Sequence, residues 1–158
     1  NLYTVDDLDN ALHAMQDKID TLKKSTSSKQ ARIKEVDELL RMVDYYKSGK
    51  PAADKLKSIR FEKSRQKYKA EHDNELRTFY MAERKLKPYF KDGKLPITAW
   101  RKERAQLEQE YRDIQTELSP LHADAKKLWA IHYNIYEVQH EQERQNTELR
   151  QKKQEIEH

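Results

Sequence analysis

A heptad repeat runs through the first part of the chain. Over residues 8–43, apolar side chains recur at alternating spacings of four and three residues, and only Thr26 and Lys29 interrupt them. The repeat comprises Leu8, Leu12, Met15, Ile19, Leu22, Ile33, Val36, Leu40 and Val43. This spacing places one apolar stripe along a helix and is typical of helices that pair as coiled coils. We therefore expect one long helix within residues 1–46, with Thr4 as its N-cap.

A second heptad repeat follows later in the chain. It comprises Trp100, Arg104, Leu107, Tyr111, Ile114, Leu118, Leu121, Ala125, Leu128, His132, Ile135 and Gln139. The preceding segment, KDGKLPITAW, predicts a helix start, in which Gly93 ends one helix, Pro96 prevents its continuation and Thr98 caps the next. We expect the second long helix over residues 98–140, followed by a polar extension over residues 141–158.

The segment between the two repeats, residues 47–97, has a helical but less regular periodicity. Gly49 and Pro51 predict the end of the first long helix, because both residues disfavour a helix interior. Two shorter helices are expected over residues 54–90, with a bend near residues 72–74.

Two heptad repeats separated by an insertion predict the fold. Charged residues make up 38% of the chain and hydrophobic residues 35%, too few apolar side chains to fill a thick globular core. We expect an all-α protein, an elongated antiparallel helical hairpin or coiled coil of two long helices with a two-helix basic insertion at one end. Val43 then lies near Trp100, and Leu8 lies near Ile135. Pro120 is expected to bend the second helix at the level of the polar break in the first.

Residues 1–158 are expected to form a single helical domain. The chain starts at Asn1 rather than Met, which indicates excision from a larger protein. It has no cysteine, no apolar run approaching the roughly 18 residues of a membrane span and no signal-peptide pattern. We therefore predict a cytoplasmic protein with no membrane partner.

Basic residues gather in the insertion. The formal net charge of the chain is +4, yet residues 47–69 alone carry nine basic side chains against Asp54 and Glu62. We assign nucleic-acid contacts to seven of these basic residues and two aromatic neighbours. They are Lys55, Lys57, Arg60, Lys63, Arg65, Lys67, Lys69, Phe61 and Tyr68.

This basic segment has two interpretations. Lys57, Arg60, Ser64 and Lys67 are expected to share a helix face, which would bind phosphates with release of counterions while nearby aromatic rings stack on unpaired bases. Alternatively, a lysine-rich helix simply has a solvated face. Segregation of the positive charge within the chain leaves the two interpretations about level, and a polyanion such as DNA would be bound with little sequence specificity.

Motifs for metal binding or catalysis are weak. Glu137-Val-Gln-His140 has the Glu-x-x-His spacing of di-iron bundles, but such sites need matching ligands from other helices. The second match, Glu155-Ile-Glu-His158, lies in the polar extension of the same helix. The sequence contains no Gly-rich phosphate loop and no nucleophile elbow. We therefore expect no cofactor, no metal site and no catalytic residue in this chain.

Several segments resemble a known family when taken in order. AEHDNELRTFYMAERKLK precedes a KDGKLP turn, then W-x-x-E-x-x-x-L-E-x-E-Y and KKLW-x-I-x-x-N. Over residues 46–142 this order is similar to the helical region after the nuclease domain of relaxases, the mobilisation nucleases of conjugative and integrative elements, particularly in Gram-positive bacteria. The family's Leu-Pro dipeptide before an acidic, Tyr-containing helix corresponds to Leu95, Pro96, Glu103, Leu107, Glu110 and Tyr111.

The resemblance implies that a full-length protein nicks DNA at a transfer origin with a tyrosine nucleophile and a histidine-held metal. The histidine motif is absent here, so the chain corresponds to a non-catalytic accessory domain that contacts DNA near the nick or recruits transfer-machinery proteins. The basic insertion favours DNA. The alternative is a coiled-coil interaction module that forms a homodimer or binds another protein and has no role with nucleic acid.

Overall fold

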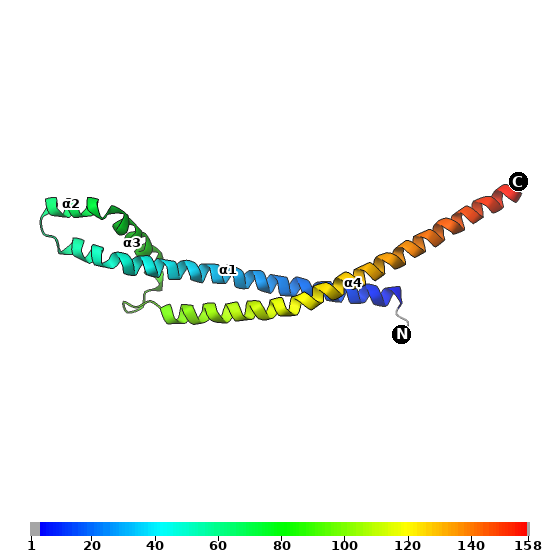
Figure 1. Ribbon diagram of the computed structural model, residues 1–158, viewed down its shortest axis with the longest axis horizontal. Helices are drawn as coiled ribbons and strands as arrows, with labels where there is room; N and C mark the ends of the chain where they lie inside the picture. The colour runs from blue at the N-terminus through cyan, green and yellow to red at the C-terminus, as the bar shows by residue number, and fades with distance from the viewer. Residues whose placement is uncertain (1–3, 158) are drawn as a thin grey trace. The chain divides into compact units, whose positions relative to one another are not determined.

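The computed structural model describes residues 4–157, which are helical almost throughout (Figure 1). The elements are α1 (Val5–Ser58), α2 (Glu62–Glu71), α3 (Asp73–Leu86), the short 3-10 helix η1 (Lys87–Tyr89) and α4 (Ile97–Glu157). Over this range the only extended pairing is an isolated bridge between Lys91 and Lys94. The predicted all-α class is therefore confirmed, and none of these described helices is long and apolar enough to cross a membrane.

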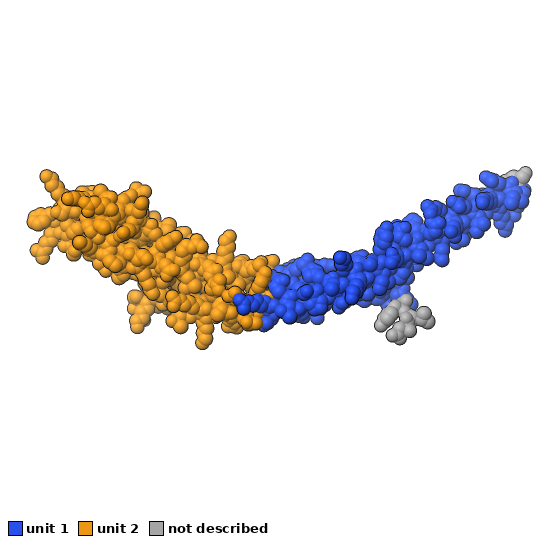
Figure 2. All heavy atoms as spheres, in the orientation of Figure 1, with its two compact units in different colours: residues 1–26, 112–158 blue, residues 27–111 orange. Residues whose placement is uncertain are grey.

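The chain divides into two compact units (Figure 2). Unit 1 comprises residues 1–26 and 112–158, and unit 2 comprises residues 27–111. The two long helices α1 and α4 contribute to both units and pack together in each.

The main core of unit 2 joins three helices. Its buried side chains are Val36, Leu39, Met42 and Val43 of α1, Ala82 and Leu86 of α3, and Trp100 of α4. The predicted proximity of Val43 and Trp100 is confirmed, because both belong to this cluster. The repeat positions Val36, Val43 and Trp100 are therefore buried as the spacing predicts, and Leu39 and Met42, which lie outside the repeat, are buried with them.

The predicted end of the first helix at Gly49 and Pro51 is wrong, since α1 continues through both residues to Ser58. Gly49 is buried against α3, where an added Cβ would lie only 2.6 Å from the Cβ of Phe79. The glycine therefore allows two helices to approach closely instead of ending one. Beyond it, Ala52, Ala53 and Leu56 are buried with Leu76 and Phe79. This burial offsets the backbone hydrogen bond that Pro51 cannot donate.

The connection from α3 to α4 also differs from the prediction. α3 ends at Leu86, and Gly93 instead occupies a tight turn with Asp92, at φ values of 74° and 52°. Lys91 and Lys94 each donate a backbone N–H to the other's carbonyl at 2.9 Å. This is the two-residue Asp-Gly turn that suits a right-handed hairpin twist.

The second long helix begins slightly earlier than expected. α4 starts at Ile97, so Thr98 lies inside its first turn and does not cap it. The carbonyl of Pro96 accepts the N–H of Trp100 at 3.0 Å, which places Pro96 at the cap position.

Two other local predictions are confirmed. The break between α2 and α3 falls at His72, within the predicted bend. At the start of α1, the Thr4 hydroxyl accepts the N–H of Asp7 at 3.1 Å, and the Asp7 carboxylate accepts the N–H of Thr4 at 3.1 Å. This reciprocal arrangement is a capping box. The backbone N–H and hydroxyl of Thr4 hold the pKa of Asp7 below its usual value.

Unit 1 has a narrower core, centred on Ile19, Leu118 and Ala125. Leu8 and Ile135 line the same hollow, as their predicted proximity requires. Thr26, one of the two polar residues that interrupt the first repeat, is buried in the structure. Its hydroxyl donates a hydrogen bond to the Leu22 carbonyl at 2.9 Å, so this buried polar group has a partner.

The C-terminal part of α4 differs from the rest of the helix in exposure. Pro120 lies inside α4, and the bend predicted there stays a prediction. Every residue from 136 to 157 is both helical and exposed. This stretch therefore buries no side chain within the described residues.

Candidate nucleic-acid interface

The basic residues singled out in the sequence lie on a short structural arm of unit 2. We call residues 55–69 the cationic arm. It consists of the last turn of α1, a three-residue link at residues 59–61 and most of α2. The Ser58 hydroxyl donates to the Lys55 carbonyl at 2.6 Å where α1 ends. α2 itself has no buried residue, so the arm is attached mainly through its ends.

All seven basic side chains of the arm are exposed: Lys55, Lys57, Arg60, Lys63, Arg65, Lys67 and Lys69. Within residues 4–157, none of them forms an ion pair. The neighbouring carboxylate of Glu62 instead accepts a hydrogen bond from Gln66 at 2.9 Å. The arm therefore presents uncompensated positive charge, which is the electrostatic condition for binding a polyanion.

The predicted single helix face is wrong. α1 ends at Ser58 and α2 begins at Glu62, so Lys57 lies on one helix and Lys67 on another, with Arg60 in the link between them. The basic side chains come from three successive elements. They form a cluster at a chain turn, not a stripe along one helix.

The two aromatic residues of the arm differ in their surroundings. Phe61 is 77% exposed and precedes the first turn of α2. Tyr68 packs against the second core cluster of unit 2, with its ring 4.2 Å from the His72 ring and the Lys55 ammonium 5.5 Å from its centroid. Phe61 is thus the aromatic ring of the arm that offers an open face for stacking.

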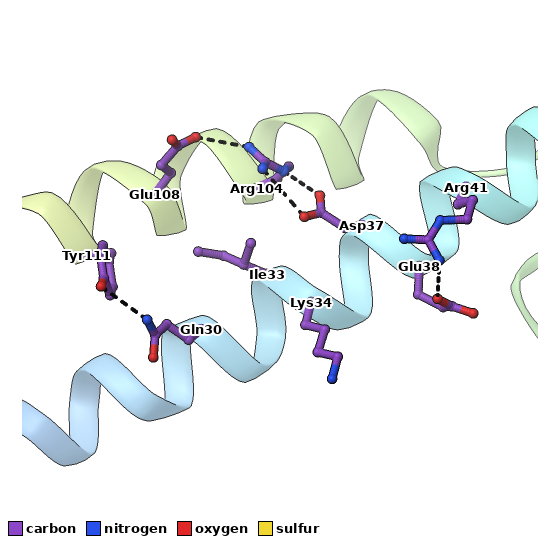
Figure 3. A pocket seen from close by; sticks show the side chains of 9 residues that line it. All are labelled: Gln30, Ile33, Lys34, Asp37, Glu38, Arg41, Arg104, Glu108 and Tyr111. Atoms are coloured by element: carbon purple, nitrogen blue, oxygen red, sulfur yellow. Dashed lines mark hydrogen bonds and ion pairs between the residues drawn. The ribbon is translucent and has the colours of Figure 1, made fainter.

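A second polar feature of unit 2 was not identified from the sequence. Figure 3 shows a groove between α1 and α4 in which Arg104 binds the carboxylates of Asp37 and Glu108. Gln30 donates to the Tyr111 hydroxyl at 3.1 Å in the same groove. The charges that line it are largely matched, so the groove joins the two helices and does not accumulate charge of one sign.

Two further ion pairs join α1 to α4 in unit 2. Arg32 binds Glu103 through two hydrogen bonds of 2.6 and 3.2 Å, and Lys29 binds Glu110 at 2.8 Å. Arg32 lowers the pKa of Glu103, and Lys29 and Gln106 lower the pKa of Glu110. These pKa shifts arise from structural ion pairs, and they favour the charged carboxylates.

The candidate metal motif is not assembled. Nowhere in the described part of the chain do three or more histidine, aspartate or glutamate side chains gather to hold a metal ion. The imidazole of His140 contacts the ring of Tyr136 at 4.8 Å, while His132 Nε2 lies 2.7 Å from Asp9 Oδ1. His158, from the second Glu-x-x-His match, lies outside the described residues.

Comparisons with protein-family models, with curated proteins and with solved structures find no match to the chain.

Proposed function

We propose that the chain is a non-catalytic accessory domain of a relaxase, which binds the DNA backbone near the transfer origin through the cationic arm. The observation that carries this proposal is the arm itself, in which seven exposed basic side chains have no acidic partner among the described residues. Phosphates neutralised there would release counterions, which gives affinity without sequence readout. Nicking would belong to a nuclease domain elsewhere in such a cytoplasmic protein.

The proposal includes an antiparallel helical hairpin of coiled-coil type as the support for the arm. In unit 2, Lys29 pairs with Glu110 and Asp37 pairs with Arg104. Residue numbers therefore fall along α4 as they rise along α1, and the pairs of unit 1 follow the same order, Asp9 with His132 and Lys18 with Glu117. Opposite chain directions and apolar heptad positions are the features of an antiparallel coiled coil.

The open ring of Phe61 extends the proposal to single-stranded DNA. Stacking on a planar side chain tolerates any base, and it requires a base that is not already paired. We therefore expect the arm to bind a single strand more tightly than a duplex of the same length.

The experiment is fluorescence-anisotropy titration of a single-stranded and a duplex oligonucleotide at low salt. The arm variant carries Lys57→Glu, Arg60→Glu, Lys63→Glu and Lys67→Glu. A control variant with the same charge change carries Lys23→Glu, Lys24→Glu, Lys152→Glu and Lys153→Glu, at exposed lysines outside the arm. Circular dichroism checks that all three proteins keep their helical content.

The expected result is micromolar or tighter binding by the wild type, loss of binding in the arm variant and near-normal binding in the control. Equal losses in the two variants would mean that net charge alone attracts DNA, which contradicts an assigned site. Absence of binding by a well-folded wild type would overturn the proposal.

A second candidate function is supported by a different observation. The exposed helical stretch at residues 136–157 buries nothing within the described chain, whereas most helical stability in proteins comes from packing of one helix face. This favours an interaction module that binds a helix of another protein, such as a component of the transfer machinery. Such a module would keep its function when the arm variant loses DNA binding.

A further inference from the structure

One flank of α4 in unit 1 carries a row of exposed aromatic side chains. Trp129, Tyr133 and Tyr136 are 48%, 61% and 51% exposed, and His140 continues the row. Their spacing of four, three and four residues places all four rings on one helix face. We call these four residues the aromatic stripe.

The stripe is distinct from the face of α4 that packs on α1. That face is made by other heptad positions, with Leu118 and Ala125 buried against Ile19. Within the described residues, the ring contacts of the stripe are local to α4, from Trp129 to His132 at 5.6 Å and from Tyr136 to His140 at 4.8 Å. The stripe is therefore left free by the packing of unit 1.

Such a surface is unusual for a chain whose residues are 38% charged. Contiguous exposed apolar patches mark interaction sites in soluble proteins, and tryptophan and tyrosine are the residues that contribute most binding energy at interfaces. Their rings bring large contact area at a small cost in side-chain entropy. The stripe thus has the composition of an interface centre.

The flanks of the stripe carry charges of opposite sign. Lys126 precedes Trp129 by three residues, and Glu143 follows His140 by three residues, so both continue the same face. Neither side chain forms an ion pair within residues 4–157. The row from Lys126 to Glu143 therefore has a spacing of three, four, three, four and three residues, which is the same when read in either direction.

We propose that the aromatic stripe is a self-association surface that binds the stripe of a second copy of this chain in antiparallel orientation. A two-fold axis between residues 134 and 135 places Tyr133 opposite the partner's Tyr136 and Trp129 opposite the partner's His140. The same axis places Lys126 opposite the partner's Glu143 at both ends. Aromatic layers at the centre and ion pairs at the rim form the usual arrangement of a specific interface.

Charge selects this orientation over the parallel one. In a parallel, in-register pair, Lys126 would meet the partner's Lys126 and Glu143 would meet the partner's Glu143. Like charges facing one another oppose association, whereas the antiparallel pair brings opposite charges together twice. The occupant that fits the stripe is therefore a second copy with reversed chain direction.

The size of the surface indicates a weak dimer. A large aromatic side chain carries about 150–250 Å², so half-exposed rings offer on the order of 100 Å² each. The three large aromatic side chains of each copy, six in the dimer, together with His140, Lys126 and Glu143 bring the buried area near 1,000 Å² in total, at the lower end of specific interfaces. We expect a dissociation constant of roughly 10–500 µM. This inference goes beyond the proposed DNA binding, because it concerns a different surface and neither depends on the other.

The first test is sedimentation velocity from about 5 to 500 µM. The weight-average mass of the wild type should rise from that of the 19.0 kDa monomer toward the dimer. Tyr133→Ala with Tyr136→Ala should weaken association at least about tenfold. The matched control is Ile131→Ala with Val138→Ala, two exposed apolar residues on a different face because each lies two residues from a ring of the stripe.

Charge exchange tests the pairing. Lys126→Glu alone and Glu143→Lys alone should each weaken the dimer, since like charges then meet, and the two changes together in one chain should restore it. Because the chain has no cysteine, Thr147→Cys provides a single spin label. The label-to-label distance should be about 40 Å in the antiparallel dimer, against about 15 Å in a parallel one.

A wild type that stays monomeric at about 500 µM would overturn the inference. So would a dimer that loses as much affinity in the control variant as in the tyrosine variant, or a short distance between the labels. DNA binding by the same proteins is measured separately. The dimer and the DNA-binding proposals are therefore tested independently, and failure of one does not decide the other.

Discussion

Gly49 of α1 lies so close to Phe79 of α3 that a methyl group on the glycine would have no space. An added Cβ would stand 2.6 Å from the Phe79 Cβ and 3.1 Å from the Glu75 carbonyl oxygen. Both neighbours belong to parts of α3 that cannot rotate away. This contact fixes how the last turns of α1, and thus the base of the cationic arm, pack on α3.

Gly49→Ala is therefore expected to destabilise the protein, although alanine favours helices by about 1 kcal/mol over glycine. Overpacking of a tight contact costs about 1–3 kcal/mol, and here it outweighs the propensity gain. Urea unfolding followed by circular dichroism measures the change. Ser48→Ala, at the exposed neighbour, is the control and should be neutral or slightly stabilising. A more stable Gly49→Ala variant would contradict the close approach of α1 and α3.

The ion pair between Arg32 and Glu103 is expected to couple α1 to α4 measurably. Its two hydrogen bonds give good geometry, but the side chains are 40% and 37% exposed, so solvent screens the pair. A double-mutant cycle with alanine should give a coupling free energy of about 0.5–1 kcal/mol, decreasing in high salt. The pair between Arg77 and Asp73, within one helix and more exposed, should give a smaller coupling. Equal couplings for the two pairs would count against a bidentate link between helices.

The free energy of unfolding is expected to fall in acid, because the carboxylates of Glu103 and Glu110 become protonated and lose their ion pairs. The pKa of Glu103 is lowered by Arg32, and that of Glu110 is lowered by Lys29 and Gln106, from an ordinary value of 4.5. A lowered folded-state pKa means that the stabilisation is fully present above the ordinary value and is lost as pH falls through the folded value. Urea unfolding midpoints measured between about pH 6 and pH 3 test this prediction. The midpoint should depend less steeply on pH in Glu103→Gln than in the wild type. If the midpoint of that variant depends on pH as steeply as that of the wild type, Glu103 makes no contribution to the loss of stability in acid.

Phe61→Ala is expected to weaken single-stranded DNA binding by roughly 5- to 100-fold, the value of one stacked base. Duplex affinity and the free energy of unfolding should stay nearly constant, because the ring is 77% exposed and buries little in the fold. Phe61→Tyr keeps an aromatic face and should preserve binding. If both variants bind as the wild type does, the ring does not stack on DNA.

Periodicity predicted the parts of the fold that depend on side chains repeating along one helix. The positions of Leu12, Ile19, Val36 and Val43 in the first repeat are all buried as expected. The start of α1 was predictable as well, since Thr4 carries the chemistry of a cap within its own sequence.

The errors occur where distant residues decide the local structure. Gly49 and Pro51 have the chemistry of a helix end, but Phe79 and Leu76 pack against that turn and the helix continues. The true end at Ser58 carries no glycine or proline signal. The spacing of the basic residues therefore predicts one helix face, whereas the residues come from three elements.

The exposure of the candidate sites could not be predicted from spacing alone. Phe61 and Tyr68 are both aromatic and each follows a basic residue, yet only contacts with Lys55 and His72 show that the ring of Tyr68 is covered. In the same way, the spacing of Trp129 and Tyr133 suits either a core or a free surface, and the packing of α1 on another face of α4 decides between them.

The salt dependence of DNA binding tests the central proposal most directly. For single-stranded DNA, the logarithm of the binding constant falls with the logarithm of salt concentration by about 0.7 per phosphate neutralised. We predict a slope of about −3 or steeper for the wild type. In the four-residue arm variant the slope should be shallower by at least about 2, and in the matched control variant it should equal that of the wild type. A slope that is the same in both variants, or no binding by the folded wild type at low salt, would contradict a DNA-binding cationic arm.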